Sequence, residues 1–431
     1  MVIKIAIIGG GSAYAPGLLH AFIRHAGDFA GAELALMDIA ADNLDVVHRL
    51  GSSMVEAAQA NLRLTATTNR RTAIADANYV LTSFRQGGFE ARHQDESIPL
   101  KHGVIGQETI GPGGFFFAMR TLPVIKAIVT EMAELAPQAV LVNYTNPTQI
   151  VAEAVNHFAN VPVISICDQS NSDLQNILAA LDIKKPTEVK YESVGLNHAT
   201  WSTRFQVNGQ DGVDLMHDAC GAVLARPDVS NRVKRQFRLT REFDRVPNSY
   251  LQYYYYREET LVEAQAAPHT RAQQIVAALP DYYTHYREEI EAPTPKLKKV
   301  RGGSLFGDMA VDVLRSLVTD DGAIHTLNVL NGNALPGFDA GRVVELPCRL
   351  DRLGATPLAQ NSLPHAVIGL LTMLAEYQWL AARAIWQGTR REAVRALAAN
   401  PLVLSLSLAE TLLDDITSLQ HSYIPKRLHH Q

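Results

Sequence analysis

The fold class is decided by one stretch at the start of the chain, Val2-Ile3-Lys4-Ile5-Ala6-Ile7-Ile8-Gly9-Gly10-Gly11-Ser12. Residues 2–8 form a short apolar run rich in β-branched side chains, which is typical of a buried strand. The glycines break this run, and a helical pattern follows over about 16–25. Glycines between a strand and a helix allow backbone N–H groups to approach a pyrophosphate at the helix N-terminus. The stretch predicts the first strand, turn and helix of an α/β domain.

Strands and helices continue to alternate through the first half of the chain. Apolar runs predict strands at 34–37, 79–84, 139–143 and 161–167. Helical patterns lie at 44–62, near 117–135 and from 148, with a long loop before the helix near 117. Continuous apolar strands that alternate with helices predict a Rossmann-like, doubly wound parallel sheet. We expect this first domain to cover residues 1–186.

The pattern changes from about residue 187. Longer, mixed strands are expected at 189–194 and 200–207, followed by a charged helical stretch at 231–300. Strongly periodic helices are expected at 363–387 and 393–419. This indicates a second α+β domain over residues 187–431, rich in C-terminal helices. Those helices are expected to pack on the first domain or on a partner subunit.

Composition excludes several classes of protein. The chain has 431 residues, of which 47% are hydrophobic and 19% charged, and its net charge of −5 argues against a general nucleic-acid binder. No apolar run approaches the roughly 20 residues that span a bilayer, and the start resembles a strand instead of a signal peptide. Three cysteines are too few for a disulfide framework. We expect a cytoplasmic protein that binds neither nucleic acid nor a membrane.

The glycine turn and the next strand together predict an NAD site. Asp38 ends that strand, where a carboxylate can accept hydrogen bonds from the ribose hydroxyls and so favours NAD over NADP. Tyr14 occupies the position of the third glycine in the usual motif, and an ordinary strand–helix turn is the alternative. The residues expected to bind the cofactor are Gly9, Gly11, Ser12, Ala13, Tyr14 and Asp38.

A cysteine and a histidine each follow an apolar run. Cys167 ends the run at 161–166 and precedes Asp168, and His198 follows Asn197 after a second run. Taken alone, either residue is most often a packed side chain. Taken together, a thiolate and an imidazole at strand ends could share one divalent metal and leave positions open for substrate oxygens. The Asp168 carboxylate could then move a proton.

Two further segments carry candidate residues. The Gly-rich segment at 84–114 follows a strand, and Arg85 in it could clamp a phosphate with two hydrogen bonds. Arg92, Asp95 and Lys101 are equally compatible with solvated ion pairs. The tyrosine segment at 250–256 has the spacing of a helix core or interface, although a tyrosine beside a metal-bound substrate could act as a base.

Together these segments resemble glycoside hydrolase family 4, the NAD- and metal-dependent glycosidases. The resemblance covers nearly the whole chain. It is carried by GGGSAYAP at 9–16, the 84–114 segment, NYTNP at 143–147, ICD at 166–168, GLNH at 195–198, PNSYLQYYYY at 247–256, RGGS at 301–304 and LNVLNGNALPGF at 327–338. The family is an exception to hydrolysis by two carboxylates.

The resemblance implies a redox-assisted elimination. NAD⁺ removes hydride from C3 of the sugar, which acidifies the C2 proton, and a divalent metal, usually manganese, polarises the C2 and C3 oxygens. A tyrosine then removes the C2 proton, the aglycone leaves, water adds and the hydride returns. By position, Cys167 and His198 match the metal ligands, and Tyr250 matches the base, with Tyr253 and Tyr254 as alternates.

The resemblance also implies a substrate class and an assembly. The 84–109 segment resembles that of 6-phospho-β-glucosidases, and the residues matched to sugar and phosphate binding are Arg85, Asn146, Asn197 and Arg271. Asp168 departs from that subgroup, because an aspartate there resembles the general acid of 6-phospho-α-glucosidases. A sugar with another C6 anion, such as a sulfonate, is a further alternative. A homodimer or homotetramer is expected.

Two readings from other classes stay open at this point. A lactate/malate-type NAD-dependent dehydrogenase would share the first domain, and it predicts that NADH accumulates. A non-catalytic nucleotide-binding sensor would bind NAD without turnover, and it would leave the Cys167 and His198 pair without a role.

Overall fold

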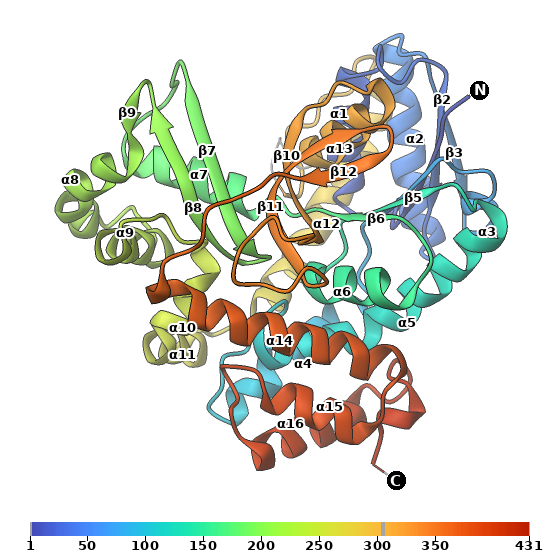
Figure 1. Cartoon of the computed structure of the whole chain (residues 1–431). Helices are drawn as coiled ribbons and strands as arrows, with labels where there is room; N and C mark the ends of the chain where they lie inside the picture. Colours follow the sequence, from blue (N-terminus) through green and yellow to red (C-terminus); the bar gives the residue numbers. More distant parts are fainter. Residues whose placement is uncertain (1, 303–306, 431) are drawn as a thin grey trace.

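A computed structural model describes residues 2–302 and 307–430 of the chain. Its strands join in one 12-stranded sheet, ordered β3-β2-β1-β4-β5-β6-β10-β11-β7-β8-β9, with β12 paired to β11 (Figure 1). The six strands from β3 to β6 run parallel in the order 3-2-1-4-5-6, which is the Rossmann arrangement. The remaining strands extend the sheet in antiparallel pairs.

The first half alternates strands and helices as the sequence predicts. Its elements are β1 Lys4–Ile8, α1 Ala15–Arg24, β2 Ala32–Met37, α2 Ala41–Ala57, β3 Leu62–Thr67, α3 Arg70–Ile74, β4 Tyr79–Thr82, α4 Gly88–Lys101, α5 Gly111–Leu135, β5 Val140–Asn143, α6 Thr148–Phe158, β6 Val163–Ser165 and α7 Gln169–Ala180.

The second half supplies the antiparallel strands and most of the helices. Its elements are β7 Val189–Leu196, β8 Ala199–Val207, β9 Gln210–Asp211, α8 Gly212–Ala225, α9 Asn231–Phe243, η1 Ser249–Leu251, α10 Gln252–Tyr255, α11 Arg257–Ala266, α12 Arg271–Ile290, α13 Asp308–Thr319, β10 Ile324–Leu330, β11 Val343–Asp351, β12 Gly354–Pro357, α14 His365–Gln387, α15 Arg390–Ala398, α16 Leu406–Leu419 and η2 Lys426–Leu428.

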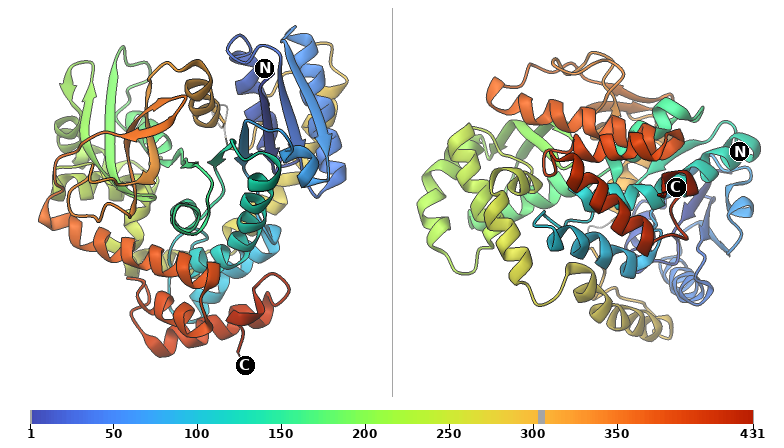
Figure 2. Two further views of the ribbon diagram at one scale, coloured as in Figure 1. Left: turned by 45° about the vertical axis from the view of Figure 1, so that its right-hand side comes forward. Right: turned by 90° about the horizontal axis from the view of Figure 1, so that it is seen from below.

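Both faces of the parallel sheet are covered, which explains the continuous apolar strands. In β1, Ala6 and Ile8 face a core that includes α5, α6 and the C-terminal helices α14 to α16. Ile5 and Ile7 face the opposite core, which includes α1, α2 and α13. In the left view of Figure 2, the orange-red to red helices α14 to α16 lie along the lower edge of the molecule, next to the teal helices of the first half. The predicted doubly wound sheet with a second part rich in C-terminal helices is confirmed. The boundary between 186 and 187 stays a prediction, and both cores draw residues from each side of it.

Several predicted elements are wrong in detail. The predicted helix at 44–62 ends at Ala57, and β3 follows as a strand whose outer residues are exposed. The predicted long loop contains α4, whose start at two glycines and internal Pro99 hide its helical pattern. The predicted helix at 393–419 is two helices, α15 and α16, which the segment around Pro401 separates.

One helix departs from the expectation about apolar runs. Helix α5 is long and apolar enough to cross a membrane by composition alone, but most of it is buried inside the protein. It begins six residues before the predicted start near 117. Its side chains pack between the sheet and the C-terminal helices, so it is a core helix.

Candidate active site

A row of paired strand residues brings the predicted metal ligands together. Each of four neighbouring strands contributes one residue to this row. The residues are, in order, Ser165 of β6, Asn328 of β10, Glu345 of β11 and Gly195 of β7. Cys167 lies two residues beyond one end of this row, and His198 lies three residues beyond the other. The turn between β7 and β8 is tight, and His198 has a φ of 64° there. The antiparallel extension therefore carries His198 to the end of β6.

Cys167 and His198 form a pair suited to a divalent cation. Cys167 Sγ lies 3.5 Å from His198 Nε2, and the other ring nitrogen, Nδ1, lies 3.2 Å from Thr109 Oγ1. Burial lowers the pKa of His198 to about 3, so its imidazole is neutral, which is the form that binds metals. Burial raises the pKa of the Cys167 thiol, whose proton a bound cation displaces. Two ligands leave open positions, as catalytic metal sites do.

Three or more His, Cys, Asp or Glu side chains suited to one metal ion are not found together anywhere in residues 2–302 and 307–430. The pair of Cys167 and His198 is thus smaller than a structural zinc site, which has four protein ligands.

Tyr250 covers this pair. Its ring stacks on the His198 imidazole, with the ring centroids 4.0 Å apart and an angle of 11° between the planes. The guanidinium carbon of Arg232 lies 4.8 Å from the same ring centroid, and Tyr253 meets the ring edge-on at 5.8 Å. Burial raises the pKa of Tyr250, and the Arg232 cation opposes that rise. The predicted base therefore contacts a predicted metal ligand directly.

Asp168 and the glycine turn meet through Tyr144. The Tyr144 hydroxyl donates a hydrogen bond to the Asp168 carboxylate, whose pKa burial raises. Tyr144 also lines a small cavity together with Gly9, Ser12 and Tyr14 of the turn. A raised pKa suits a carboxyl group that donates a proton. The predicted proton-transfer residue and the predicted cofactor turn therefore lie on either side of Tyr144.

The glycine turn has the geometry of a dinucleotide cradle. Gly9 has a φ of 97°, and a Cβ there would lie 2.1 Å from the Ser83 carbonyl oxygen of β4's end. The Asp38 carboxylate accepts hydrogen bonds from the backbone N–H groups of Gly11 and Ala40, each at 3.0 Å. These contacts fix Asp38 at the end of β2, where the ribose of a bound dinucleotide lies in this fold.

Helix α12 covers the same turn. Tyr283 donates a hydrogen bond to the Gly11 carbonyl at 2.9 Å, and Tyr286 donates one to the Ala13 carbonyl at 2.7 Å. Burial raises the pKa of Tyr283 to about 12, so the hydroxyl keeps its proton for this bond. The predicted cofactor residues are therefore held together by a helix from the second half of the chain.

A cluster of arginines lies beside the pair of ligands. Arg85 and Arg92 both contact Glu108, Arg92 through Nη1 at 3.0 Å. Burial alone would raise the pKa of Glu108, but the two guanidinium groups outweigh it and hold that pKa below its ordinary value. Arg85 Nη1 is buried and makes no hydrogen bond with the described residues. An unused charged donor of this kind suits an anionic ligand.

Arg92 and Asp95 are buried, so the alternative of a solvated ion-pair surface is wrong for both. Asp95 pairs with Arg120, and neither side chain is exposed. Only Lys101 lies on the surface. The segment at 84–114 is therefore fixed by charges inside the protein, because buried charges require partners.

The structure separates some of the other predicted residues from the cluster. Arg271 is exposed, and it donates a hydrogen bond to Gln274 in its own helix. Asn146 accepts hydrogen bonds from Thr148. Asn197 is buried and donates a hydrogen bond to Glu345 at 2.9 Å. Of the RGGS segment, residues 303 and 304 lie outside the described residues, while Arg301 stacks on Tyr14 at 4.3 Å.

Comparison with known proteins covers both halves of the chain. The model of family 4 glycosyl hydrolases matches residues 4–183, and that of the family's C-terminal domain matches residues 193–403. The chain belongs to glycosyl hydrolase family 4. A probable 6-phospho-beta-glucosidase of Bacillus subtilis is 33% identical to this family 4 chain, over 98% of both chains.

Two solved structures of family 4 enzymes share the fold. A 6-phospho-beta-glucosidase of Thermotoga maritima with manganese, NAD⁺ and glucose-6-phosphate is 26% identical, with a TM-score of 0.86 over 98% of this chain and 99% of that one. A 6-phospho-alpha-glucosidase from gut microorganisms, in complex with NAD and glucose-6-phosphate, is 28% identical, with a TM-score of 0.88 over 99% of both chains.

Sequence reasoning missed two charged residues beside the predicted site of this family 4 chain, the buried Glu345 and the half-buried Arg232. Glu345 accepts hydrogen bonds from Asn197 and Asn328, each at 2.9 Å, and burial raises its pKa to about 7. A single carboxylate in the otherwise apolar run Val343–Cys348 is the signal that could have found it. Arg232 carries no such signal, because helix α9 contains four other arginines and lysines.

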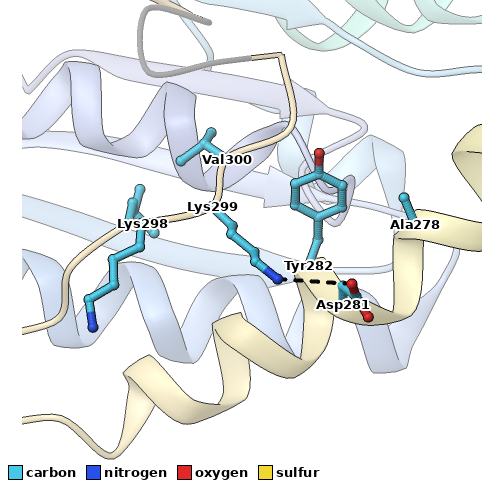
Figure 3. Close-up of a pocket in the computed structure, with 7 residues that line it drawn as sticks. Ala278, Asp281, Tyr282, Lys298, Lys299 and Val300 are labelled. Carbon is cyan, nitrogen blue, oxygen red and sulfur yellow. Dashed lines mark ion pairs between the residues drawn. The ribbon is translucent and has the colours of Figure 1, made fainter.

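An open surface recess lies elsewhere and is not the site. Figure 3 shows it between α12 and the segment 297–300, with Lys299 Nζ 3.9 Å from Asp281 Oδ2. An exposed ion pair of this kind contributes about 0–1 kcal/mol. None of the predicted site residues lines this recess. This recess is open to solvent, whereas the predicted site residues Cys167, His198 and Tyr250 are packed closely together.

Proposed function

We propose that this chain is a glycosidase that hydrolyses 6-phospho-glucosides with NAD and a divalent metal, manganese by preference. The observation that carries the proposal is the contact between Cys167 and His198 at 3.5 Å with Tyr250 stacked on the imidazole. Relatives named as 6-phospho-glucosidases, and related structures with NAD and manganese, support the substrate class and both cofactors. We favour the 6-phospho-β-glucosidase type.

The residues proposed to hold the cofactors are those that the sequence predicts, and the geometry of the site supports them. Cys167 and His198 would bind the metal. Six residues would hold the dinucleotide, namely Gly9, Gly11, Ser12, Ala13, Tyr14 and Asp38. When bound, NAD would supply hydride-transfer chemistry at C3 of the sugar, and the metal would supply Lewis-acid stabilisation of the sugar oxygens.

The chain's own side chains would move the protons. Tyr250 would accept the C2 proton, since its ring lies against a metal ligand and hence beside the sugar carbons. Asp168 would donate its proton to the leaving oxygen of the aglycone, since its pKa is raised and Tyr144 holds the carboxyl group in place. Water then adds at C1, and the net reaction is hydrolysis without net oxidation.

Other residues are proposed to bind the sugar and its phosphate. Arg85 has an unused buried donor for an anion, and Asn146 and Asn197 follow strands that end at the site. Arg271 is proposed from the family resemblance, and it would have to turn from Gln274 toward the phosphate. Glu108 partly neutralises Arg85, so a phosphate would share that cation with a carboxylate.

A 6-phospho-α-glucosidase is the second candidate. An aspartate at the position of Asp168 resembles the general acid of 6-phospho-α-glucosidases, and burial raises the pKa of Asp168. The deciding experiment compares p-nitrophenyl α- and β-6-phospho-glucosides, with a 6-sulfonated analogue as a third substrate. We expect release of p-nitrophenol only with Mn²⁺, a reductant and NAD⁺. Undiminished activity after the bound NAD has been stripped away, or stoichiometric accumulation of NADH, would refute the proposal.

Two further expectations concern the whole protein. We propose a homodimer or homotetramer, which light scattering coupled to size-exclusion chromatography tests. A cytoplasmic location remains the expectation from sequence, and fractionation of cells that produce the protein checks it.

A further inference from the structure

A group of polar side chains beside Tyr250 has no part in the mechanism above. Ser249 donates its backbone N–H to Asp173 Oδ2 at 2.8 Å and its hydroxyl to Asp173 Oδ1 at 2.7 Å. The same hydroxyl accepts a hydrogen bond from Arg232 Nε at 2.6 Å. Asp173 lies on α7, which begins directly after Asp168, and Arg232 lies on α9. This group therefore joins the helix of the proposed acid to the segment of the proposed base.

Arg232 and His198 hold the Tyr250 ring between them. The imidazole lies nearly parallel to the ring at 4.0 Å and so covers one of its faces. The guanidinium lies over the ring at 4.8 Å, so it must take the other face. A cation–π contact contributes about 0.5–2 kcal/mol, which resists tilting of the ring. Removal of Arg232 would leave one face of Tyr250 without support.

One donor of Arg232 has no acceptor. Its Nη2 is buried and makes no hydrogen bond with the described residues, although Asp173 Oδ1 is 3.8 Å away. A buried donor without a partner costs about 1–3 kcal/mol. The Arg232 guanidinium is therefore held by the Ser249 hydroxyl and the Tyr250 ring, with Asp173 nearby.

We propose that Arg232 is a positioning residue. It holds the Tyr250 ring so that the Tyr250 hydroxyl faces C2 of the bound sugar, and Asp173 and Ser249 in turn hold Arg232. The inference rests on the proposed function, because it takes Tyr250 to be the base. Displacement of a reacting group by about 1 Å costs about 100-fold in rate. Loss of Arg232 should therefore slow proton removal while substrate and NAD still bind.

The test compares Arg232→Met, Arg232→Lys and a control, Arg238→Met, which changes an exposed arginine of the same helix. The substrate is a p-nitrophenyl 6-phospho-glucoside with hydrogen or deuterium at C2, assayed with saturating NAD⁺ and Mn²⁺. We expect Arg232→Met to lower kcat about 10- to 100-fold and to raise the C2 isotope effect. KM and NAD affinity should change less than about threefold. The kcat and the isotope effect of Arg232→Lys should lie between those of Arg232→Met and the wild type. The control should match the wild type in both.

A wild-type kcat and isotope effect in Arg232→Met would overturn the proposal. A loss of NAD affinity as large as the loss of kcat would also overturn it, because Arg232 would then serve the cofactor site or the fold. If Arg232→Met does not fold, Arg232→Lys decides, since it keeps the charge but lacks the planar fork. A wild-type isotope effect in that variant overturns the positioning role.

The wild-type enzyme separates this inference from the proposed function. If it shows no NAD-dependent hydrolysis, the proposed function fails. If it does show NAD-dependent hydrolysis and Arg232→Met behaves like it, only the positioning role fails.

Discussion

Replacement of Gly9 by alanine should nearly abolish NAD binding. Gly9 has a φ of 97°, which disfavours any side chain by about 1–2 kcal/mol. The added Cβ would lie 2.1 Å from the Ser83 carbonyl oxygen, well inside the 3.4 Å at which ordinary contact begins. The turn must therefore move away from β4 by about 1 Å, and a shift of that size costs about 100-fold in a well-oriented site.

Titration calorimetry of the stripped protein with NAD⁺ measures this loss directly. We expect affinity to fall at least about 100-fold and the free energy of unfolding to fall by about 1–3 kcal/mol. The control is Gly27→Ala in the same half of the chain, because a Cβ at Gly27 meets nothing within 4 Å. Wild-type NAD affinity in Gly9→Ala would show that the turn does not hold the cofactor, and an equal loss in Gly27→Ala would make the effect nonspecific.

Four further predictions address the other groups of the site. Cys167→Ala should lower Mn²⁺ affinity by more than about tenfold in calorimetry, together with activity; unchanged metal affinity would exclude the thiol as a ligand. Tyr250→Phe should abolish exchange of the C2 proton with solvent, and persistent exchange would move the base to a neighbouring tyrosine. Asp168→Asn should slow poorly activated aglycones most, while equal losses for good and poor leaving groups would argue against a general acid. Burial raises the pKa of Glu345 to about 7, so the folded protein binds this proton more tightly than the unfolded chain. The free energy of unfolding of the metal-free protein should therefore fall by about 3 kcal/mol as pH rises from 4.5 to 7. Urea titrations across that range should show the fall, and Glu345→Gln should remove it.

The parallel half of the fold was predictable because its signals are local. Residues 2–12 contain a strand, a turn and the start of a helix in one short segment, and β1 and α1 lie where that pattern predicts. The errors occur where local signals are weak. Strand β3 lies at the edge of the sheet, so its outer residues are polar, and α4 begins at glycines. In both cases tertiary packing decides the conformation, since intrinsic propensity is a weak constraint.

The candidate residues were predictable one by one, but their neighbours were not. Cys167, Asp168 and His198 each follow an apolar run, which marks them as strand-end residues. No local sequence pattern shows that the Arg232 guanidinium lies over the Tyr250 ring, or that Glu345 accepts a hydrogen bond from Asn197. Those contacts join residues at least 18 positions apart in the chain and depend on how helices and strands pack.

The sequence by itself determined the Rossmann-like half, its glycine turn and the family, because periodicity and short motifs record which backbone conformations the chain adopts. Only the tertiary structure decided that Cys167 Sγ lies 3.5 Å from His198 Nε2. That distance depends on the row of pairings from β6 through β10 and β11 to β7, in which β10 and β11 lie more than 120 residues after β6 and β7 in the chain. A pairing between distant strands depends on packing throughout the sheet, so no short stretch of sequence can specify it.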